Sequence, residues 1–445
     1  MNIDFLKERM LLNKDKVAVV SDDVEYTFSK LYDEYLNAKV FLEENNIHKS
    51  NIVLINADYN ARSIAMMIAL IELDTVIVPI SLSSKSLDKF IRISQAEYVI
   101  KIDDDIKINK IEVIVDNPLL ADFLKKENSG LILFSSGSTG EPKGILHDLR
   151  FLIEKYKKTG KTLKTISFLL FDHIGGFNTM MYSLSNGNMI VTLKDRSPEE
   201  ICKAIEKYKV ELLPTSPTFI NLLILSGVYE RYDLSSLKII SYGTEPMPEL
   251  TLKKLHDIFP DIKLKQTYGL SEVGILSTKS LNSDSLWIKL GGDDFKVKIV
   301  DDILYIKSQT SMIGYLNAPF PFDEDGWFNT NDKVEQNGTG YIKILGRKSE
   351  LIVIGGEKVY PSEIENVLIS MDGINDASVF SQPNSITGKA IVAVVSVDKE
   401  NNNREFIKKI RTFCKNNLES FKRPSTIKLT EDNLYNERFK KKRMF

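Results

Sequence analysis

Cysteine and histidine are scarce in this sequence. Its 445 residues include two cysteines, Cys202 and Cys414, which lie far apart, and four histidines without the spacing of metal ligands. We therefore expect neither a disulfide framework nor a zinc site. Charge of one sign is also lacking, because 59 basic residues nearly balance 61 acidic ones. A formal net charge of -2 gives no indication of binding to nucleic acid or to an anionic membrane.

Long apolar runs are missing too. No stretch approaches the roughly 20 apolar residues of a membrane span, and the first ten residues, M-N-I-D-F-L-K-E-R-M, carry charges where a signal peptide is apolar. We therefore expect a cytoplasmic protein without a membrane span. The composition, 43% hydrophobic and 27% charged, is that of a globular protein. A chain of 445 residues exceeds what one core usually supports, which predicts at least two domains.

Short apolar, β-branched runs alternate with helix-like stretches in the first half of the chain. Such runs are typical of buried strands in a parallel sheet with helical crossovers. The predicted strands are residues 16–20, 51–55, 75–80, 98–102, 131–134 and 189–193. Helices are predicted at 58–71 and 198–208, the second with Ser197 as N-cap before Pro198. This pattern predicts a large α/β domain.

The texture of the sequence changes twice after this region. Residues 285–345 contain short strand-like runs broken by Gly, Asn and Asp, which predicts a β-rich subdomain. The remaining 100 or so residues are typical of a small α+β domain. Its predicted elements are strands at 351–354, 376–380 and 390–397 and helices at 362–370 and 403–417. We therefore predict a large domain, 1–346, and a small C-terminal domain, 347–445.

The segment 135–144, S-S-G-S-T-G-E-P-K-G, follows a predicted strand and is rich in glycine and hydroxyl groups. Glycines allow backbone N–H groups to converge on phosphate oxygens, and Lys143 can offset phosphate charge. The segment is not a Walker A loop, because that motif requires Lys followed by Ser or Thr. A flexible surface turn is the alternative interpretation.

This segment resembles the phosphate-binding signature of the adenylate-forming superfamily, [ST]-S-G-[ST]-T-G-x-P-K-G. The superfamily includes acyl-CoA synthetases, aryl-CoA ligases, luciferases and the adenylation domains of peptide synthetases. Four further segments resemble family motifs and follow in the family's order. S-Y-G-T-E-P at 241–246 resembles the G-G-x-P turn, and T-Y-G-L-S-E at 267–272 resembles Y-G-x-[ST]-E. G-W-F-N-T-N-D at 326–332 resembles G-W-F-x-T-G-D, and Gly346-Arg347 resembles G-R. Each match taken alone also has a structural interpretation, such as a core aromatic for Tyr268 or a surface charge for Arg347.

The resemblance implies an α/β fold with a β-rich subdomain, a small mobile C-terminal domain, and a site for ATP and Mg²⁺. It implies that Tyr268 stacks on adenine, that Asp332 accepts the ribose hydroxyls with help from Arg347, and that Glu272 and Thr139 bind magnesium. The nucleotide-binding residues implied in this way are Ser135, Ser136, Gly137, Ser138, Gly140, Lys143, Gly243, Thr244, Glu245, Tyr268, Gly269, Ser271, Asp332 and Arg347.

The family's catalytic lysine lies near the C-terminus in G-K-[IVL]-x-R. Here residues 436–443 read N-E-R-F-K-K-K-R, without glycine. Aligning Arg443 with the arginine of the motif places Lys440 in the catalytic position, with Lys441 as its rival and a solvated basic tail as the alternative. The resemblance also implies that Gly355 and Gly356 line the route of a thiol, although a hairpin turn there is compatible with it. The candidate hinge residues are Lys348 and Ser349.

The implied reaction has two steps. A carboxylate attacks the α-phosphate of Mg-ATP and releases pyrophosphate, and a thiol then displaces AMP, with Lys440, Thr139, Glu272 and His173 as the implied catalytic residues. CoA is the expected thiol. A phosphopantetheine on a separate carrier protein is the alternative, because no carrier motif is visible in the chain. An inert nucleotide binder and a kinase are rival classes, which the product nucleotide would distinguish.

Residues 169–178, L-L-F-D-H-I-G-G-F-N, bear on the identity of the acid. His173 and Gly176 resemble the F-H-x-x-G pattern of acyl- and aryl-CoA ligases. Asp172 instead permits the F-D-x-S pattern of amino-acid-activating domains, where the aspartate binds the substrate ammonium. We favour an acyl or aryl acid, with Asp172, Gly176 and Gly243 as candidate substrate-binding residues.

Overall fold

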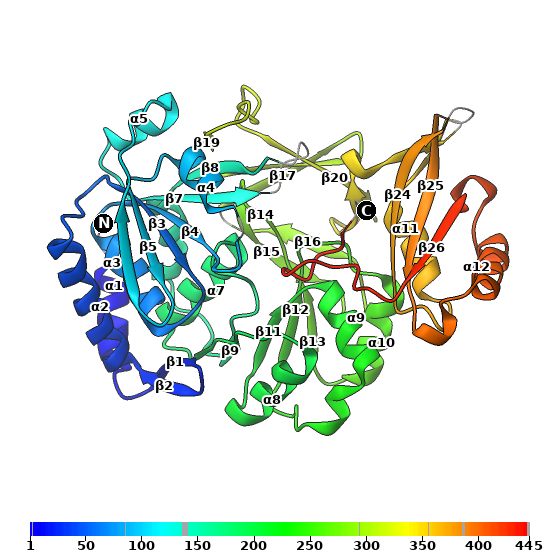
Figure 1. The fold of residues 1–445 in the computed structure, drawn as a ribbon, viewed down its shortest axis with the longest axis horizontal. Coiled ribbons are helices and arrows are strands. Elements are labelled where there is room, and N and C mark those ends of the chain that lie inside the picture. Colours follow the sequence, from blue (N-terminus) through cyan, green and yellow to red (C-terminus); the bar gives the residue numbers. More distant parts are fainter. Residues whose placement is uncertain are drawn as a thin grey trace.

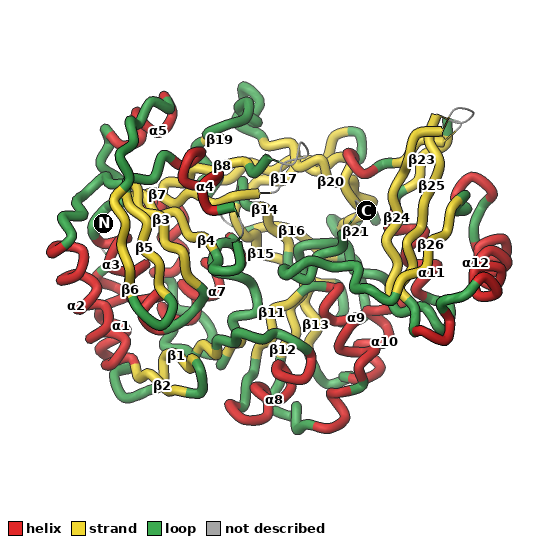
Figure 2. The backbone as a smooth tube through the Cα atoms, in the orientation of Figure 1, coloured by secondary structure: helices red, strands yellow, loops and turns green. Residues whose placement is uncertain are grey.

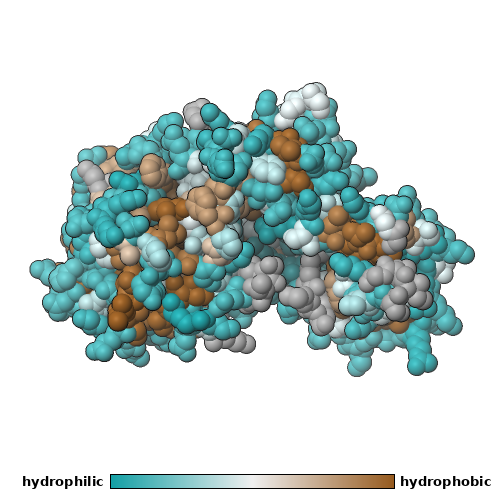
Figure 3. Space-filling view, turned by 90° about the horizontal axis from the view of Figure 1, so that it is seen from above, coloured by the Kyte–Doolittle hydropathy of each residue, from teal (hydrophilic) through white to brown (hydrophobic). Residues whose placement is uncertain are grey.

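The computed structural model describes residues 1, 3–84, 86–135, 141–292, 294–354, 356–384 and 388–442. Figure 1 shows the blue N-terminal elements at one end of the molecule and the orange and red C-terminal elements at the other. Seen from above, the surface is hollowed between a larger and a smaller part (Figure 3). No helix within the described ranges combines the length and the apolar character needed to cross a membrane.

The first sheet contains the strands that flank the segment 136–142. Its strands are β3 (Ile52–Ala57), β4 (Val76–Ile80), β5 (Tyr98–Ile102), β6 (Ile106–Lys110), β7 (Gly130–Ser135), β8 (Lys143–Asp148) and β19 (Gly314–Tyr315), in the order β19-β8-β7-β4-β3-β5-β6. β7, β4, β3 and β5 pair in parallel, whereas β8, β19 and β6 are antiparallel to their neighbours. The predicted strands 51–55, 75–80, 98–102 and 131–134 therefore form the parallel centre of this sheet, as expected, whereas the antiparallel strands β6, β8 and β19 were not predicted.

Helices flank this sheet. They are α1 (Asp4–Leu12), α2 (Phe28–Glu44), α3 (Ala61–Glu72), α4 (Leu87–Ser94) and α5 (Pro118–Leu124). α3 begins three residues later than the predicted helix, because Asn60 caps it by accepting a hydrogen bond from the Ser63 backbone N–H. Every residue of β3 and β4 is buried, as their continuous apolar runs predict.

The second sheet is parallel except for one edge pair. Its strands are β1 (Val17–Ser21), β2 (Val24–Thr27), β9 (Thr165–Ile166), β10 (Ile190–Val191), β11 (Leu212–Thr215), β12 (Ile239–Tyr242) and β13 (Lys263–Gln266), in the order β13-β12-β11-β9-β10-β1-β2. The helical segments of this region are α6 (Leu149–Glu154), η1 (Lys155–Lys157), α7 (Ile174–Ser185), α8 (Pro198–Tyr208), α9 (Pro217–Ser226), η2 (Val228–Arg231) and α10 (Glu249–Ile258). α8 has the predicted bounds, and Ser197 is its N-cap.

The third sheet is the predicted β-rich subdomain. It consists of β14 (Tyr268–Leu270), β15 (Gly274–Ser280), β16 (Ile288–Gly291), β17 (Phe295–Val300), β18 (Ile303–Ser308), β20 (Phe328–Gln336) and β21 (Ile342–Arg347), in the order β14-β15-β16-β21-β20-β18-β17. The strand pairs for which the register is described are antiparallel. These three sheets confirm the predicted α/β class with a β-rich part.

The C-terminal part has a hydrophobic core of its own, built around residues such as Ile364, Ile391 and Ile410. Its elements are η3 (Lys348–Glu350), β22 (Ile352–Ile354), β23 (Glu357–Val359), α11 (Pro361–Ile369), β24 (Asp376–Asn384), β25 (Gly388–Ser396), η4 (Lys399–Asn401), α12 (Arg404–Asn417), η5 (Ser420–Lys422) and β26 (Thr426–Thr430). The boundary at residues 346 and 347 falls at the end of β21 and remains a prediction, as does the hinge within η3. After β26 the chain runs as a loop from this part back to the middle of the molecule (Figure 2).

Candidate active site

The phosphate-loop residues Ser136, Gly137, Ser138, Thr139 and Gly140, and also Gly355, lie outside the described residues. The two ends of the loop are described: Ser135 ends β7 and pairs with Lys143, which begins β8. The predicted loop is therefore shorter than residues 135–144, because both of its ends belong to strands of an antiparallel hairpin.

Tyr315 brings two of the predicted site residues together. Its hydroxyl donates a hydrogen bond of 2.9 Å to Oε1 of Glu272, and Lys143 Nζ lies 5.2 Å from the centroid of its ring. The sequence motifs did not include this tyrosine, which lies on the short edge strand β19. Lys143 and Glu272 thus share a contact although 129 positions separate them in the sequence.

Glu272 is the described residue that fits the implied magnesium ion. Magnesium is commonly held by one or two carboxylates together with phosphate oxygens. The described residues contain no group of three or more His, Cys, Asp or Glu side chains that could hold a metal ion. A magnesium ion bound by the Glu272 carboxylate would take further ligands from the phosphate oxygens of a nucleotide.

A second cluster joins Tyr268, Asp332 and Arg347. The Tyr268 hydroxyl donates a hydrogen bond of 2.5 Å to Oδ2 of Asp332, and Nε of Arg347 lies 3.5 Å from Oδ1. Asp332 and Arg347 face each other on the neighbouring strands β20 and β21. Burial raises the pKa of Asp332, while the Arg347 charge and the Tyr268 hydrogen bond oppose that rise. This buried carboxylate is therefore oriented by two partners from the β-rich sheet.

The backbone near Ser271 is fixed by a histidine that the sequence motifs also missed. His147, fully buried on β8, has its Nε2 2.7 Å from the Ser271 carbonyl oxygen. Burial lowers the pKa of His147 to about 4, so the ring is neutral near pH 7 and Nε2 can donate to the carbonyl.

Two predicted glycines allow close packing around the site. A Cβ atom on Gly243 would lie 2.5 Å from Oγ1 of Thr267, and one on Gly269 would lie 2.5 Å from a side-chain carbon of Ile275. Thr244 follows Gly243 with a positive φ of 74°, and its side chain is exposed. These close contacts let the turn after β12 approach β14.

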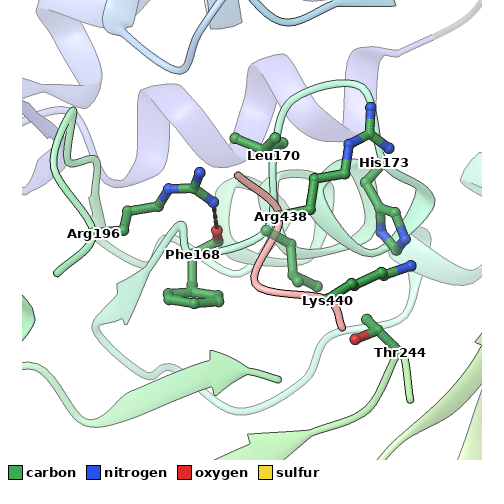
Figure 4. Close-up of a pocket in the computed structure, with 8 residues that line it drawn as sticks. Phe168, Leu170, His173, Arg196, Thr244, Arg438 and Lys440 are labelled. Atoms are coloured by element: carbon green, nitrogen blue, oxygen red, sulfur yellow. Dashed lines mark hydrogen bonds between the residues drawn. The ribbon is translucent and has the colours of Figure 1, made fainter. Parts of the chain in front are cut away.

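One pocket brings further predicted residues together (Figure 4). It is lined by Phe168, Leu169, Leu170, His173, Arg196, Thr244, Arg438 and Lys440. The close-up shows Lys440 reaching toward His173 and Thr244 from the C-terminal segment. Burial, together with the nearby charge of Arg438, lowers the pKa of Lys440 to about 8. Residues from three distant parts of the sequence therefore meet at one pocket.

His173 is both the N-cap of α7 and a wall of this pocket. Its Nδ1 accepts a hydrogen bond of 3.0 Å from the Gly175 backbone N–H. Burial lowers the pKa of His173 well below its ordinary value, and the charges of Lys440 and Arg438 add to that effect. The ring is therefore neutral near pH 7, with the proton on Nε2.

The two candidate lysines point to different places. Lys441 Nζ donates a hydrogen bond of 2.9 Å to the Ala377 carbonyl and lies 3.1 Å from Asp376 and 3.8 Å from Glu365, all in the C-terminal part. Lys440, by contrast, lines the pocket with His173. Lys440 therefore faces the pocket, whereas the side chain of Lys441 contacts the C-terminal part.

Glu245 makes its side-chain contacts away from the pocket that Lys440 lines. Its Oε1 accepts a hydrogen bond of 2.8 Å from the Thr218 backbone N–H, and Oε2 accepts one of 3.3 Å from the backbone of Lys441. The backbone contact of Glu245 with a nucleotide that the resemblance implies remains a prediction.

The candidate substrate residues Asp172 and Gly176 do not line this pocket. Oδ2 of Asp172 lies 2.7 Å from Nη2 of Arg438, and a Cβ atom on Gly176 would lie 2.1 Å from the Leu170 carbonyl oxygen. Gly356, a candidate for the thiol route, lies in the β22–β23 hairpin with φ of 91° and is not a pocket residue either. The proposed roles of these three residues in substrate or thiol binding remain predictions.

Comparison with known proteins identifies the family. Residues 6–316 match the sequence profile of the AMP-binding enzyme family, and residues 363–441 match that of the AMP-binding enzyme C-terminal domain. The chain belongs to the AMP-binding enzyme family.

Three curated relatives illustrate the similarity. The 4-coumarate–CoA ligase-like 9 of Arabidopsis thaliana is 29% identical over 61% of this chain and 54% of its own length. The indoleacetate–CoA ligase of Aromatoleum aromaticum is 30% identical over 60% of this chain and 56% of its own. The chain thus spans about half the length of these two relatives. The 2-succinylbenzoate–CoA ligase of Listeria monocytogenes is 24% identical over 96% of this chain and 95% of its own.

Solved structures support the fold. An anthranilate CoA ligase in complex with anthranoyl-AMP superposes with a TM-score of 0.80 at 17% identity, covering 98% of this chain and 95% of its own. The o-succinylbenzoate CoA synthetase from Bacillus subtilis has a TM-score of 0.79 at 19% identity, covering 99% and 96%. Both similarities extend over nearly the whole chain, including the C-terminal part.

Proposed function

We propose that this protein activates a carboxylic acid as its acyl-adenylate with ATP, releases pyrophosphate, and then transfers the acyl group to the thiol of CoA. The observation that carries the proposal is the position of Lys440 in one pocket with His173 and Thr244. Family membership supports the same reaction, as do the names of the relatives: a 4-coumarate–CoA ligase-like protein, an indoleacetate–CoA ligase and a 2-succinylbenzoate–CoA ligase.

The described residues suit the charge that this chemistry must stabilise. When a carboxylate attacks the α-phosphate of ATP, negative charge collects on the phosphate oxygens, and fixed cations and donors lower the barrier. Lys440 would supply the cation, and His173 would donate from Nε2. A magnesium ion held by Glu272 would neutralise further phosphate charge. Thr139 is the second proposed magnesium ligand.

The nucleotide is proposed to lie against the Tyr268–Asp332–Arg347 cluster, with its phosphates toward Lys143. Asp332 is oriented from both sides, by Tyr268 and by Arg347, so its acceptor positions are fixed before a ribose arrives. Lys143 and Glu272 share Tyr315, which holds the proposed phosphate-binding and metal-binding groups close together.

An acyl or aryl acid is favoured over an amino acid. In the amino-acid reading Asp172 would bind the substrate ammonium, but here its carboxylate is paired with Arg438. The lining of the pocket includes three cations, Arg196, Arg438 and Lys440, and three apolar residues, Phe168, Leu169 and Leu170. This environment suits a carboxylate with an apolar body and opposes a second cation.

CoA is the proposed acceptor because two of the curated relatives named above are CoA ligases and the third is named as CoA ligase-like. A stand-alone enzyme that loads a separate carrier protein is the second candidate, since both acceptors present the same phosphopantetheine thiol. A cytoplasmic location remains part of the proposal.

The test is a product screen with purified protein, Mg-ATP and panels of aliphatic, aromatic and amino acids. We expect AMP and pyrophosphate to form with aliphatic or aromatic acids, and adding CoA should yield a thioester detectable by mass spectrometry. Formation of ADP would indicate a kinase, and the absence of any acid-dependent product would contradict the proposal. Turnover with amino acids alone would overturn the proposed acid class.

A further inference from the structure

We propose that Asp172 and Arg438 form a latch that holds Lys440 in the pocket, so that Asp172 is a positioning residue for the C-terminal segment rather than a substrate-binding residue. This inference rests on the proposed function only for its effect on activity. The latch itself follows from the contacts of residues 436–440, which we call the tip turn.

Hydrogen bonds within the tip turn hold its residues together. The side-chain oxygen of Asn436 accepts hydrogen bonds from the backbone N–H groups of Arg438, at 2.9 Å, and Lys440, at 3.2 Å. The Asn436 N–H donates to the Lys440 carbonyl at 3.0 Å, and the Phe439 N–H donates to the Asn436 carbonyl at 2.9 Å. Because these four bonds tie Arg438 to Lys440, fixing one of the two side chains restricts the other.

Several contacts attach the tip turn to the rest of the molecule. Arg196 donates a hydrogen bond of 2.8 Å to the Glu437 carbonyl, and the Ser216 hydroxyl donates one of 2.8 Å to the Phe439 carbonyl. These contacts reach the backbone of the tip turn. The ion pair of Asp172 and Arg438, at 2.7 Å, joins side chains 266 positions apart.

Asp172, unlike its partner Arg438, is a buried member of this ion pair. Its side chain is 7% exposed, and its other oxygen, Oδ1, is buried without a hydrogen-bond partner in the described structure. A buried carboxylate is costly unless a cation compensates it. Undocking the tip turn removes the Arg438 cation and leaves Oδ2 of Asp172 with the backbone N–H of Ser81, which donates to it at 3.5 Å. The state with Arg438 in place is therefore favoured.

The latch lies next to the proposed chemistry. Asp172 precedes His173, which lines the pocket, and Arg438 lies two residues before Lys440, which lines the same pocket. The ion pair therefore holds the two proposed catalytic residues, Lys440 and His173, at one pocket. Arg438 itself is also a wall of that cavity, which fixes its guanidinium between the ion pair and the pocket.

Chemical labelling of lysines tests the latch without any need for the acid substrate. The intact protein is treated briefly with an amine-acetylating reagent, and acetylation of Lys440 is measured by peptide mass spectrometry against the exposed Lys125. The variants are Asp172→Asn, Arg438→Gln, Arg438→Lys and the double variant Asp172→Asn/Arg438→Gln. The control is Arg231→Gln, which removes an exposed ion pair with Glu199 away from the pocket.

We expect each of the two disrupting single variants to raise the labelling rate of Lys440 about tenfold or more, because a charge-assisted hydrogen bond of this kind is lost. Arg438→Lys should restore part of the protection. The double variant should resemble a single variant, because both changes break the same pair. Unchanged labelling in Arg438→Gln, whose side chain is 36% exposed, would overturn the proposal. Effects that multiply in the double variant would also overturn it.

Activity gives a second readout once the screen above has identified an acid. The latch variants should slow acid-dependent ATP–pyrophosphate exchange about tenfold or more, and leave thioester formation from supplied acyl-adenylate near the rate of Arg231→Gln. Equal losses in both half-reactions would contradict a positioning role. If no acid supports exchange, the proposed function fails, while the labelling result still decides the latch.

Discussion

The Tyr268 hydroxyl donates a hydrogen bond of 2.5 Å to the buried carboxylate of Asp332. If that carboxylate binds the ribose, Asp332→Asn should weaken ATP binding about 10- to 100-fold, the usual effect of losing charge-assisted hydrogen bonds. Titration calorimetry with ATP measures this change. Asp302→Asn is the control, because Asp302 lies in the β17–β18 turn of the same sheet and contacts Lys333 at the surface. Equal affinity in wild type and Asp332→Asn would remove Asp332 from the nucleotide site.

Phe439 occupies the place where the family motif has glycine, and its φ is 51°. Its ring packs against Phe168 and Phe219, with centroids 5.2 and 5.5 Å away, and stacks on Tyr435. The left-handed conformation costs about 1 kcal/mol, whereas removing a packed aromatic side chain costs about 3 kcal/mol or more. Packing therefore outweighs backbone strain in this turn.

Phe439→Gly should accordingly slow acid-dependent ATP–pyrophosphate exchange at least about tenfold, although glycine relieves the strain. Thioester formation from supplied adenylate should change little, because the same turn need not dock for that step. Exchange as fast as in wild type would show that the aromatic contacts do not hold Lys440 in place.

The lowered pKa of Lys440, about 8, predicts a pH dependence. Lys440 carries its charge below this pH and loses it above, so kcat/KM for ATP in the exchange reaction should fall as the pH rises through about 8. Lys440→Arg keeps its charge over this range and should lack that fall, whatever its absolute rate. Profiles of the same shape for both proteins would assign the titration to another group.

Gly176, a residue of the family motif, is expected to be required for close packing of the backbone. A Cβ atom there would lie 2.1 Å from the backbone oxygen of Leu170, which cannot move aside as a flexible side chain can. We expect Gly176→Ala to lower the free energy of unfolding by about 1–3 kcal/mol in urea titrations. Gly291→Ala, which meets no atom within 4 Å, should change it by less than about 0.5 kcal/mol. Equal stability of the two variants would contradict this role.

Local signals predicted much of the fold. α8 has the bounds that its Ser197 cap and Pro198 predict, since both act within one turn of the helix. The predicted strand at 189–193 shortens to Ile190–Val191, because its length depends on pairing with β1 and β9, which are distant in sequence. The pairing of the edge strand β19 with β8 joins residues distant in sequence as well.

In the candidate site, too, local motifs were predicted from the sequence and long-range contacts were not. The motifs pointed to Tyr268, Asp332 and Arg347, which meet in the structure. They gave no signal for Tyr315 or for the contact between Asp172 and Arg438, because those side chains meet only through tertiary packing across 43 and 266 positions. The sequence also left Lys440 and Lys441 as rivals, and only their surroundings separate them.

The most direct test of the account is acid-dependent ATP–pyrophosphate exchange by wild type, Lys440→Ala and Lys442→Ala with an acid from the screen. Lys440→Ala should slow exchange about 10²- to 10³-fold, the usual effect of losing one group that stabilises transition-state charge. Lys442→Ala, an exposed neighbour, should be near wild type. Exchange by Lys440→Ala at the wild-type rate would contradict the claim that Lys440 stabilises the adenylation transition state.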